Sequence, residues 1–372
     1  MFSNKRGGFV SYNKKYMELA IELAKKGAGA VNPNPLVGAV IVKNDRIIGQ
    51  GYHARYGELH AERAAFANLT ESAEGAEMYV TLEPCCHYGK QPPCVEAIVE
   101  NKISKVYVGS DDPHDKVAGK GIKYLRNHGI DVETQIMKKE CDDLNFVFFH
   151  YITTGLPYVV MKYAMTMDGK IATYTGESKW ISNEKSRMLV QETRKNLTGI
   201  MVGIGTVLKD NPMLTCRLEN GRNPIRIVCD TKLRIPMDCN LVKTASEIQT
   251  IVATDKNADS EKINKLEEYG VKVLLLDTLD NHIDLKKLMI MLGEMKIDGI
   301  LLEGGGTLNN SALTAGIVNE VQVYIAPKIF GGKDAPTAVE GQGVTSPDLS
   351  HSFKIKSIEE IDDDVLLKYT KN

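Results

Sequence analysis

The sequence predicts an α/β protein built from two domains, and three observations support this. The chain has 372 residues, more than one hydrophobic core usually holds. Strand and helix patterns alternate along it in two separate series. Between the two series, the stretch ITTGLP at 152–157 contains the glycine and proline that are typical of a linker. We therefore expect one domain over residues 1–152 and a second over residues 153–372.

The first series begins with a helix and a hairpin. YMELAIELAKKGAG places apolar side chains on one helical face, and residues 37–52 alternate as two strands around a polar turn at Lys43–Asp45. Further helices are predicted at 60–69, 94–101 and 119–129, and further strands at 77–84, 105–110 and 130–136. The alternation fades near residues 145–151.

The second series is richer in apolar runs that are typical of buried parallel strands. Strands are predicted at 157–164, 199–203, 224–230, 248–254, 271–276, 299–304 and 320–327. Helices fit between several of them, for example at 182–196 and 307–316.

Composition excludes several classes of protein. The net charge is −2 with no block of like charge, so we expect no nucleic acid partner held through phosphates. The N-terminus has basic residues but no apolar segment after them, which argues against a secretory signal, and no apolar run approaches the ~18 residues of a membrane span. Seven scattered cysteines do not form a disulfide framework. We expect a cytoplasmic protein with no membrane partner.

One short window gathers residues that could bind a metal: His60, Glu62, Cys85, Cys86 and Cys94. Catalytic zinc takes three protein ligands of nitrogen or sulfur type and leaves one position for water. His60, Cys85 and Cys94 would supply these ligands. Proline precedes Cys85 and Cys94, so each thiol could lie near a helix start, where the helix dipole favours the thiolate.

Glu62 is the candidate general acid and base beside that metal. Two positions on an ideal helix lie ~200° apart, so His60 and Glu62 can share a site only if His60 stands at the helix entrance. By itself, His-Ala-Glu is most often a solvated helix turn, and an isolated cysteine is usually a small buried apolar residue. The combined pattern is that of the zinc nucleobase deaminases, except that eight residues rather than two separate Cys85 from Cys94.

That exception points to one family. EPCCHYGKQPPC resembles the deaminase half of the bifunctional riboflavin-biosynthesis family, diaminohydroxyphosphoribosylaminopyrimidine deaminase/5-amino-6-(5-phosphoribosylamino)uracil reductase, whose pattern is close to E-P-C-S-H-x-G-[RK]-T-P-P-C. The stretches at 32–42, 51–62 and 112–132 resemble the same family. The resemblance implies a cytidine-deaminase-like three-layer domain. It places Cys85 and Cys94 on the zinc ligands and leaves Cys86, where the family often has serine, as the spare thiol.

The resemblance also implies substrate contacts in this half. Asn34 would meet the pyrimidine with His53 nearby, and His87 and Lys90 would hold the 5′-phosphate. The sequence departs from the family pattern at three positions, Gln91, His114 and Asp115.

In the second half, Gly304–Gly306 follow a predicted strand and open a helix, a turn that can seat a phosphate. It is not the dinucleotide fingerprint, because the third glycine is absent. Together with MTMDGKIA and VGIGTVLKDNPML, it resembles the reductase half of the same family, which has a dihydrofolate-reductase-like α/β fold and uses NADPH.

The second resemblance implies a set of contacts. NADPH would contact Ala164, Trp180, Thr206, Asp210, Thr231 and the turn residues Gly305, Gly306, Thr307, Leu308, Asn309, Asn310 and Ser311. Substrate would contact Ser178, Arg194, Leu214, Arg217 and Glu303. The two arginines suit a sugar phosphate, since guanidinium binds phosphate through two donors, although surface charges are the alternative. Lys162 could polarise the ribose carbonyl during reduction.

The sequence therefore predicts a bifunctional enzyme with one Zn²⁺ per chain, NADPH and a phosphorylated pyrimidine substrate. Hydrolytic deamination would precede reduction of the ribosyl group to ribityl, and we expect a homo-oligomer, a dimer or tetramer. Two alternatives stay open at this point. An RNA-editing deaminase would need a nucleic-acid-binding tail, and a structural zinc module would need a fourth protein ligand, for which His87 is the candidate.

Overall fold

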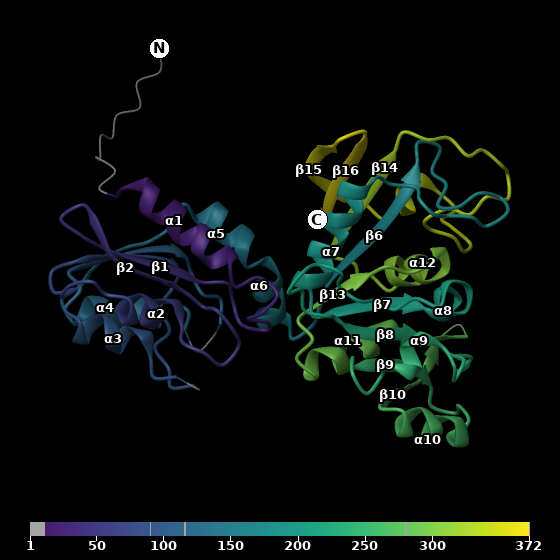
Figure 1. Ribbon diagram of the computed structural model, residues 1–372, viewed down its shortest axis with the longest axis horizontal. Coiled ribbons are helices and arrows are strands. Elements are labelled where there is room, and N and C mark those ends of the chain that lie inside the picture. Colours follow the sequence, from purple (N-terminus) through teal and green to yellow (C-terminus); the bar gives the residue numbers. More distant parts are fainter. Residues whose placement is uncertain (1–11, 90, 115–116, 280, 372) are drawn as a thin grey trace, which may run out of the picture. The chain divides into compact units, whose positions relative to one another are not determined.

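A computed structural model describes residues 12–89, 91–114, 117–279 and 281–371. The chain divides into two compact units, Met1–Thr153 and Thr154–Asn372 (Figure 1). Each unit has its own sheet and its own hydrophobic core, so the two are described separately.

The first unit contains a five-stranded sheet in the order β2-β1-β3-β4-β5. The strands are β1 (Gly38–Lys43), β2 (Arg46–Tyr52), β3 (Glu77–Leu82), β4 (Lys105–Ser110) and β5 (Asp131–Glu133). β1 pairs antiparallel with β2 and β3, and β3, β4 and β5 are parallel. The hairpin predicted at 37–52 is confirmed. Asn44 and Asp45 form its turn with positive φ angles of 51° and 59°, which these two residue types tolerate well.

Helices cover both faces of this sheet, which makes three layers (Figure 1). α1 (Lys14–Lys25) and α5 (Lys138–Leu144) pack on one face, against Val40 and Tyr107. α2 (Ala61–Ala67), α3 (Cys94–Glu100) and α4 (Lys120–Asn127) pack on the other, against Ile41 and Val108. Successive side chains along each strand point to opposite faces of the sheet, so each face has its own hydrophobic core. The three-layer domain expected from the sequence is confirmed.

Two further helices end the first unit, in the region where the sequence pattern fades. α5 is followed after one residue by α6 (Phe146–Thr154), an apolar helix of sequence FVFFHYITT. Its apolar residues show no single face, so no helical period marks this segment in the sequence.

The second unit contains a nine-stranded sheet in the order β10-β9-β8-β7-β13-β6-β14-β16-β15. The strands from β10 to β14 pair with one another in parallel. β16 pairs antiparallel with both β14 and β15. The bounds are β6 (Tyr158–Thr166), β7 (Gly199–Gly203), β8 (Ile225–Cys229), β9 (Thr250–Asp255), β10 (Val271–Leu276), β13 (Gly299–Leu302), β14 (Glu320–Ala326), β15 (Phe353–Ile361) and β16 (Asp364–Lys371). A small separate hairpin joins β11 (Thr278–Leu279) to β12 (His282–Ile283).

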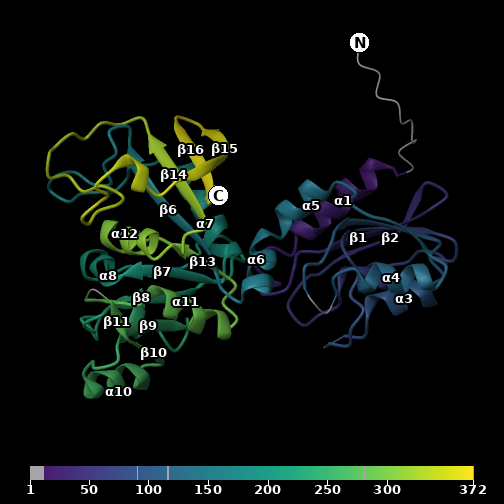
Figure 2. The ribbon, with the colours of Figure 1, turned by 180° about the vertical axis from the view of Figure 1, so that it is seen from behind.

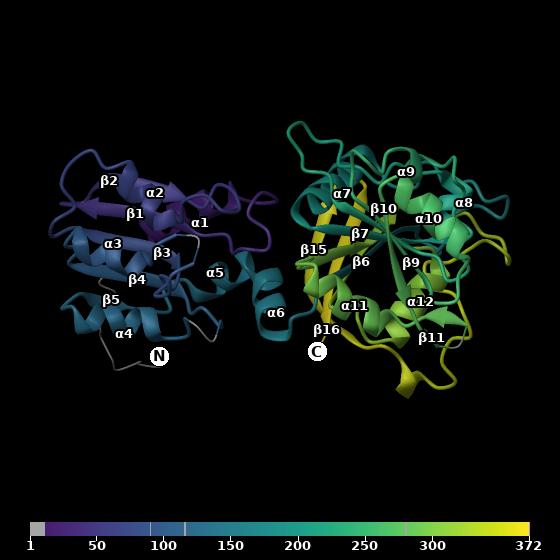
Figure 3. The same cartoon turned by 90° about the horizontal axis from the view of Figure 1, so that it is seen from below.

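Helices cover both faces of the larger sheet as well (Figures 2 and 3). On one face lie α7 (Glu184–Asn196), α8 (Ile204–Asp210), α9 (Asn240–Lys243) and α10 (Ser260–Glu268). On the other lie α11 (Leu285–Glu294) and α12 (Gly306–Thr314), and a short 3₁₀ turn spans Pro347–Leu349. Among the helices that the structure describes, none has the length and apolar character needed to cross a membrane.

Arg226, the second residue of β8, is fully buried. Its guanidinium donates hydrogen bonds to the carbonyl oxygens of Leu241 and Ile248 and to the hydroxyl oxygens of Thr244 and Thr250. Burial lowers its pKa to about 10. This one side chain therefore joins β8 to α9 and to β9.

Candidate active sites

His60 stands at the entrance of α2. Its backbone is extended, with φ −70° and ψ 159°, and the helix begins at the next residue, Ala61. Glu62 lies in the first turn and is 3% exposed. Because His60 precedes the regular helix, its side chain and that of Glu62 line the same pocket. The expectation that His60 lies at a helix entrance is confirmed.

His60, Cys85 and Cys94 converge on one point. The Nδ1 atom of His60 lies 3.5 Å from Sγ of Cys85 and 3.4 Å from Sγ of Cys94, and the three ligand atoms are all within 4.8 Å of one another. Zinc bonds of ~2.3 Å to sulfur and ~2.0 Å to nitrogen at tetrahedral angles would separate S from N by about 3.5 Å. The donor types and spacing therefore fit a zinc ion.

The two thiols reach this point from different local structures. Cys94 is the first residue of α3, as expected, whereas Cys85 lies in the irregular segment after β3. The expectation of a helix start at Cys85 is thus wrong, because no helical turn follows Pro84. The backbone N–H of Cys94 nevertheless donates to Sγ of Cys85 at 3.3 Å, so the first turn of α3 stabilises the Cys85 thiolate.

Several pKa values in the site are shifted, and hydrogen bonding to Cys85 and burial raise that of Cys94. Hydrogen bonding to Cys94, and then to His60, lowers the pKa of Cys85 to about 4. Burial, and then the nearby Cys85 charge, raises the pKa of Glu62 above its usual range. The pocket therefore offers a ready thiolate and a carboxyl group that holds a proton more firmly than one in water.

Cys86 does not belong to the ligand group. Its side chain is half-buried and packs against the core formed with α2 and α3, and burial raises its pKa. It does not line the pocket either, so the geometry agrees with its treatment as the spare thiol.

Asn34, His53 and His87 line the same pocket, which has a volume of about 330 Å³. Nδ2 of Asn34 lies 3.1 Å from Nε2 of His53, and Nδ1 of His53 lies 3.0 Å from the Leu59 carbonyl oxygen. The Leu59 carbonyl can only accept, so Nδ1 carries the proton and Nε2 accepts from Asn34. Burial lowers the pKa of His53 and keeps the ring neutral. Lys90 and Asp115 lie outside the described residues.

Several lining residues were not identified from the sequence. Burial raises the pKa of Asp112 to about 6, and the ring of His114 stacks on that of His87 with centroids 6.1 Å apart. His114 was noted in the sequence only as a departure from the family pattern and not as a residue of the site. α6 contributes Phe148, Tyr151 and Ile152 to the pocket wall, and nothing in the sequence around them indicated a site.

The second unit carries a larger cleft of about 780 Å³ at the carboxyl ends of its parallel strands. Most of the residues expected to contact NADPH or substrate line it: Lys162, Ala164, Ser178, Thr206, Asp210, Thr231, Glu303, Gly305, Gly306, Thr307, Leu308 and Ser311. Lys209, Lys232 and Arg234 also line it and were not predicted. Arg234 sits in the turn after β8, where a lone basic residue gives no distinctive pattern.

The other expected residues lie outside the lining of this cleft. Trp180 is 56% exposed and stacks on the guanidinium of Arg187, 4.6 Å from the ring centroid. Asn309 is buried and donates to the Ala338 carbonyl oxygen, so its amide holds the glycine-rich turn rather than facing the cleft. The remaining four are Asn310, Leu214, Arg194 and Arg217.

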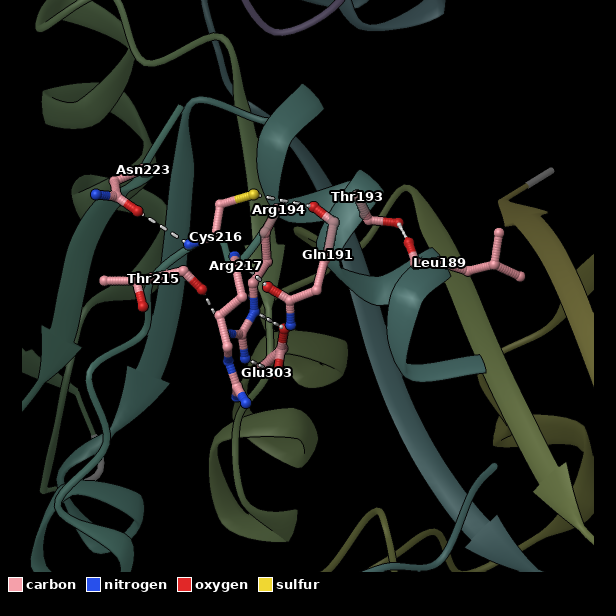
Figure 4. Close-up of polar contacts among 9 residues, drawn as sticks. All are labelled: Leu189, Gln191, Thr193, Arg194, Thr215, Cys216, Arg217, Asn223 and Glu303. Atoms are coloured by element: carbon pink, nitrogen blue, oxygen red, sulfur yellow. Dashed lines mark hydrogen bonds and ion pairs between the residues drawn. The ribbon is translucent and has the colours of Figure 1, made fainter. Parts of the chain in front are cut away.

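Arg194 and Glu303 form a buried bidentate ion pair (Figure 4). Both N···O distances are 2.9 Å, and a third nitrogen of Arg194 donates to the Thr215 carbonyl oxygen. Burial opposes ionisation of Glu303, but the charges of Arg194 and Lys162 outweigh it and lower the pKa of Glu303 to about 2. The guanidinium of Arg194 is thus paired with the carboxylate of Glu303, whereas the side chain of Arg217 is exposed.

Glu303 lines the same cleft as Lys162. Burial lowers the pKa of Lys162, and the negative charge of Glu303 works against that effect. An amine with a lowered pKa at the floor of a cleft is suited to donate a hydrogen bond or a proton to a bound carbonyl group.

Comparison with known proteins finds a family match in each half of the chain. Residues 157–367 match the family described as the RibD C-terminal domain, and residues 10–110 match the cytidine and deoxycytidylate deaminase zinc-binding region. The riboflavin biosynthesis protein RibD of Actinobacillus pleuropneumoniae is 53% identical over 95% of this chain and 94% of its own length. The RibD of Bacillus amyloliquefaciens is 43% identical over the same shares of the two chains.

Solved structures extend the similarity to the fold. The diaminohydroxyphosphoribosylaminopyrimidine deaminase/5-amino-6-(5-phosphoribosylamino)uracil reductase of Thermotoga maritima is 38% identical, with a TM-score of 0.86 over 96% of this chain and 98% of that one. Form 1 of RibD from Acinetobacter baumannii has the same TM-score and coverage at 35% identity.

Proposed function

The chain belongs to the RibD family of riboflavin biosynthesis proteins, and on this premise we propose that it catalyses two consecutive reactions, one in each unit. The first is hydrolytic removal of the 2-amino group of a diaminopyrimidinone ribosyl phosphate. The second is NADPH-dependent reduction of the ribosyl group to ribityl. The observation that carries this proposal is the convergence of His60, Cys85 and Cys94 beside a pocket that Glu62 also lines, in a chain that also carries the reductase cleft.

In the first reaction, His60, Cys85 and Cys94 would hold the zinc ion. When bound, zinc would lower the pKa of a water molecule and so supply the nucleophile. Glu62, buried beside these ligands, takes a proton from water and delivers it to the departing amino nitrogen, which leaves as ammonia.

The rest of the pocket binds the substrate in this proposal. Asn34 and His53 contact the pyrimidine, and His87 with Lys90 binds the 5′-phosphate. The neutral His53 ring, protonated on Nδ1, keeps Nε2 as an acceptor and fixes the direction of the Asn34 amide.

In the second reaction, NADPH, when bound, would supply the hydride that reduces the ribose carbonyl group. Lys162 donates to the carbonyl oxygen, where negative charge develops. The negative charge of Glu303 acts on Lys162, and the ion pair with Arg194 fixes Glu303. We assign phosphate binding to the exposed Arg217 rather than to Arg194, because the Arg194 guanidinium already has a carboxylate partner.

The residues of the Gly305–Ser311 turn, where α12 begins, would hold the phosphates of NADPH. Thr206, Asp210 and Thr231 line the same cleft and complete the expected contacts. Trp180, Leu214, Asn309 and Asn310 stay predictions from the family resemblance.

We also propose a cytoplasmic location and a homo-oligomer, a dimer or tetramer. The seven cysteines are an odd number and are scattered along the sequence, which supports a reducing compartment. β15 supports self-association, because it is the edge strand of its sheet and exposes Ile355 and Ile358 at 63% and 61%. Light scattering on the purified chain would check the second point, and a monomer at all concentrations would contradict it.

The central experiment is to incubate the zinc-loaded protein with the diaminopyrimidinone substrate and follow ammonia. When NADPH is then added, the absorbance of NADPH should fall. This fall should occur only if deamination has taken place first. Release of ammonia from a labelled tRNA, without NADPH oxidation on the pyrimidine, would contradict the proposal.

Glu62→Ala separates the two reactions. The variant should keep its zinc, because Glu62 is not a ligand, and should lose deamination by the ~10²–10⁴-fold typical of acid–base groups. NADPH oxidation with the already deaminated substrate should not change. If the metal content also falls, Glu62 is a ligand and its proposed role is wrong.

A further inference from the structure

Asn145 makes an unusual pair of hydrogen bonds to the backbone of one distant residue. It stands between α5 and α6 and is 2% exposed. Its Oδ1 accepts from the N–H of Leu36 at 2.7 Å, and its Nδ2 donates to the Leu36 carbonyl oxygen at 2.9 Å. A single side-chain amide thus forms the two bonds that a neighbouring strand would form.

Leu36 belongs to the loop that carries Asn34 into the deaminase pocket. This loop joins α1 to β1, and Asn34 lies between Pro33 and Pro35. Neither proline has an N–H to donate, so few backbone bonds can fix the loop. Those that the structure describes nearby are the N–H of Asn34 to the Val31 carbonyl oxygen and the N–H of His53 to the Val37 carbonyl oxygen. Leu36, between them, is held by Asn145.

The contact between Asn145 and Leu36 lies next to Asn34 and His53, the residues proposed to contact the pyrimidine. Two residues before Leu36, Nδ2 of Asn34 meets Nε2 of His53 at 3.1 Å, and Nδ1 of His53 meets the Leu59 carbonyl oxygen next to His60. A shift of the Leu36 backbone would therefore move the Asn34 amide relative to both the imidazole and the metal ligands.

Asn145 also begins the helix that walls the pocket. Its carbonyl oxygen accepts from the N–H of Phe149, the first-turn bond of α6. Phe148, Tyr151 and Ile152 of that helix line the same pocket as Asn34. One residue therefore fixes the substrate loop through its side chain and the pocket wall through its backbone.

We propose that Asn145 is a positioning residue of the deaminase reaction, which holds the Leu36 backbone so that Asn34 and His53 face the pyrimidine. This rests on the proposed substrate role of Asn34. Asn145 does not line the pocket itself, so it acts through the loop and not by touching the substrate.

Asn145→Ala tests this. Deaminase kcat/KM should fall about tenfold or more, mainly through a higher KM, because the loop is displaced while the zinc ligands and Glu62 stay in place. Zinc per chain and NADPH oxidation with the deaminated substrate should not change. Asn101→Ala is the matched control, since the Asn101 amide also donates to a backbone carbonyl, that of Ala97, but far from the loop.

A double-mutant cycle distinguishes positioning from general damage. If Asn145 acts through Asn34, then Asn145→Ala should cost little further activity in an Asn34→Ala background. Fully multiplicative losses would overturn the inference. Asn145→Asp keeps the acceptor for the Leu36 N–H and loses the donor, so it should fall between wild type and Asn145→Ala, and it serves if the alanine variant does not fold.

The single variants separate this inference from the proposed function. A damaged Asn34→Ala with an undamaged Asn145→Ala overturns the role of Asn145 alone. Normal kinetics in Asn34→Ala would overturn the substrate role of Asn34 and, with it, the inference.

Discussion

At the scale of single residues, three thiols that are close in the sequence do not all have the same role. Cys85 and Cys94 meet His60, and Cys86 packs into the core beside them. Cys86→Ser should therefore keep one zinc per chain and most deaminase activity, since serine has nearly the same shape. Cys85→Ser and Cys94→Ser should each lose the metal, because a serine hydroxyl is a poor zinc ligand near neutral pH. Metal analysis of the three purified variants decides this, and zinc lost only from Cys86→Ser would contradict the ligand assignment.

The Arg194–Glu303 pair predicts how stability depends on pH. The folded-state pKa of Glu303, about 2, is below its unfolded value of 4.5, so its contribution is complete above pH 4.5 and is lost as the pH falls toward 2. The shift corresponds to about 3 kcal/mol of unfolding free energy. Glu303→Gln should lower stability most above pH 4.5, and the difference from wild type should shrink in acid.

Urea unfolding followed by the fluorescence of Trp180 measures this effect, because the chain has only that tryptophan and it lies in the second unit. Glu359→Gln is the control, since Glu359 pairs with Lys368 at a more exposed position where ion pairs contribute little. A difference that stayed constant from pH 6 to pH 2 would contradict the assignment to Glu303 ionisation.

At the scale of elements, the contact between α1 and β1 depends on one glycine. A Cβ atom on Gly38 would lie 1.9 Å from the carbonyl oxygen of Ala20, a backbone atom of α1. Gly38→Ala should therefore force the helix away from the sheet and destabilise the first unit by ~1–3 kcal/mol. Gly89→Ala is the control, since no atom lies within 4 Å of its Cβ position. The melting temperature, followed by the near-ultraviolet circular dichroism of the stacked Tyr79 and Tyr107, gives the answer.

The sequence predicted the elements whose side-chain pattern matches their burial. The seven buried parallel strands of the second unit are apolar runs, and all seven are found. β15 and β16 were missed, although β16 pairs with β14 in the sheet. In β15 most side chains are exposed, and lysine and glutamate alternate with isoleucine, so no apolar face marks the strand. Short helices such as α9, of four residues, are too brief to show a period.

The same reasoning separates predictable from unpredictable parts of the sites. His60, Glu62, Cys85 and Cys94 lie in local motifs, so their chemistry is visible in the sequence. Asn145 lies 109 residues from Leu36, and only the folded chain brings its amide to that backbone. Arg194 was expected to bind phosphate because its charge is visible in the sequence, whereas its pairing with Glu303, 109 residues away, is not.

At the scale of the whole molecule, the two units should fold separately, and α6 decides where the first one ends. A fragment of residues 1–154 should bind zinc and deaminate, since its core lies within Met1–Thr153. A fragment of residues 1–144 lacks α6 and Asn145, so it should lose deamination even where it keeps the metal. Equal activity of the two fragments would contradict the place of α6 in the site, and an unfolded longer fragment would show that the units share a core.

The buried guanidinium of Arg226 has a consequence for the order of assembly. Its partners come from α9, from the segment after it, from β9 and from Met213 in the segment after α8, and none of them is a carboxylate. If β8 were covered before those partners arrived, an unsolvated cation would remain, at a cost of several kcal/mol. Intermediates with only part of this region docked are therefore disfavoured. This one side chain therefore makes the folding of this part of the sheet cooperative, so that β8, α9 and β9 form together.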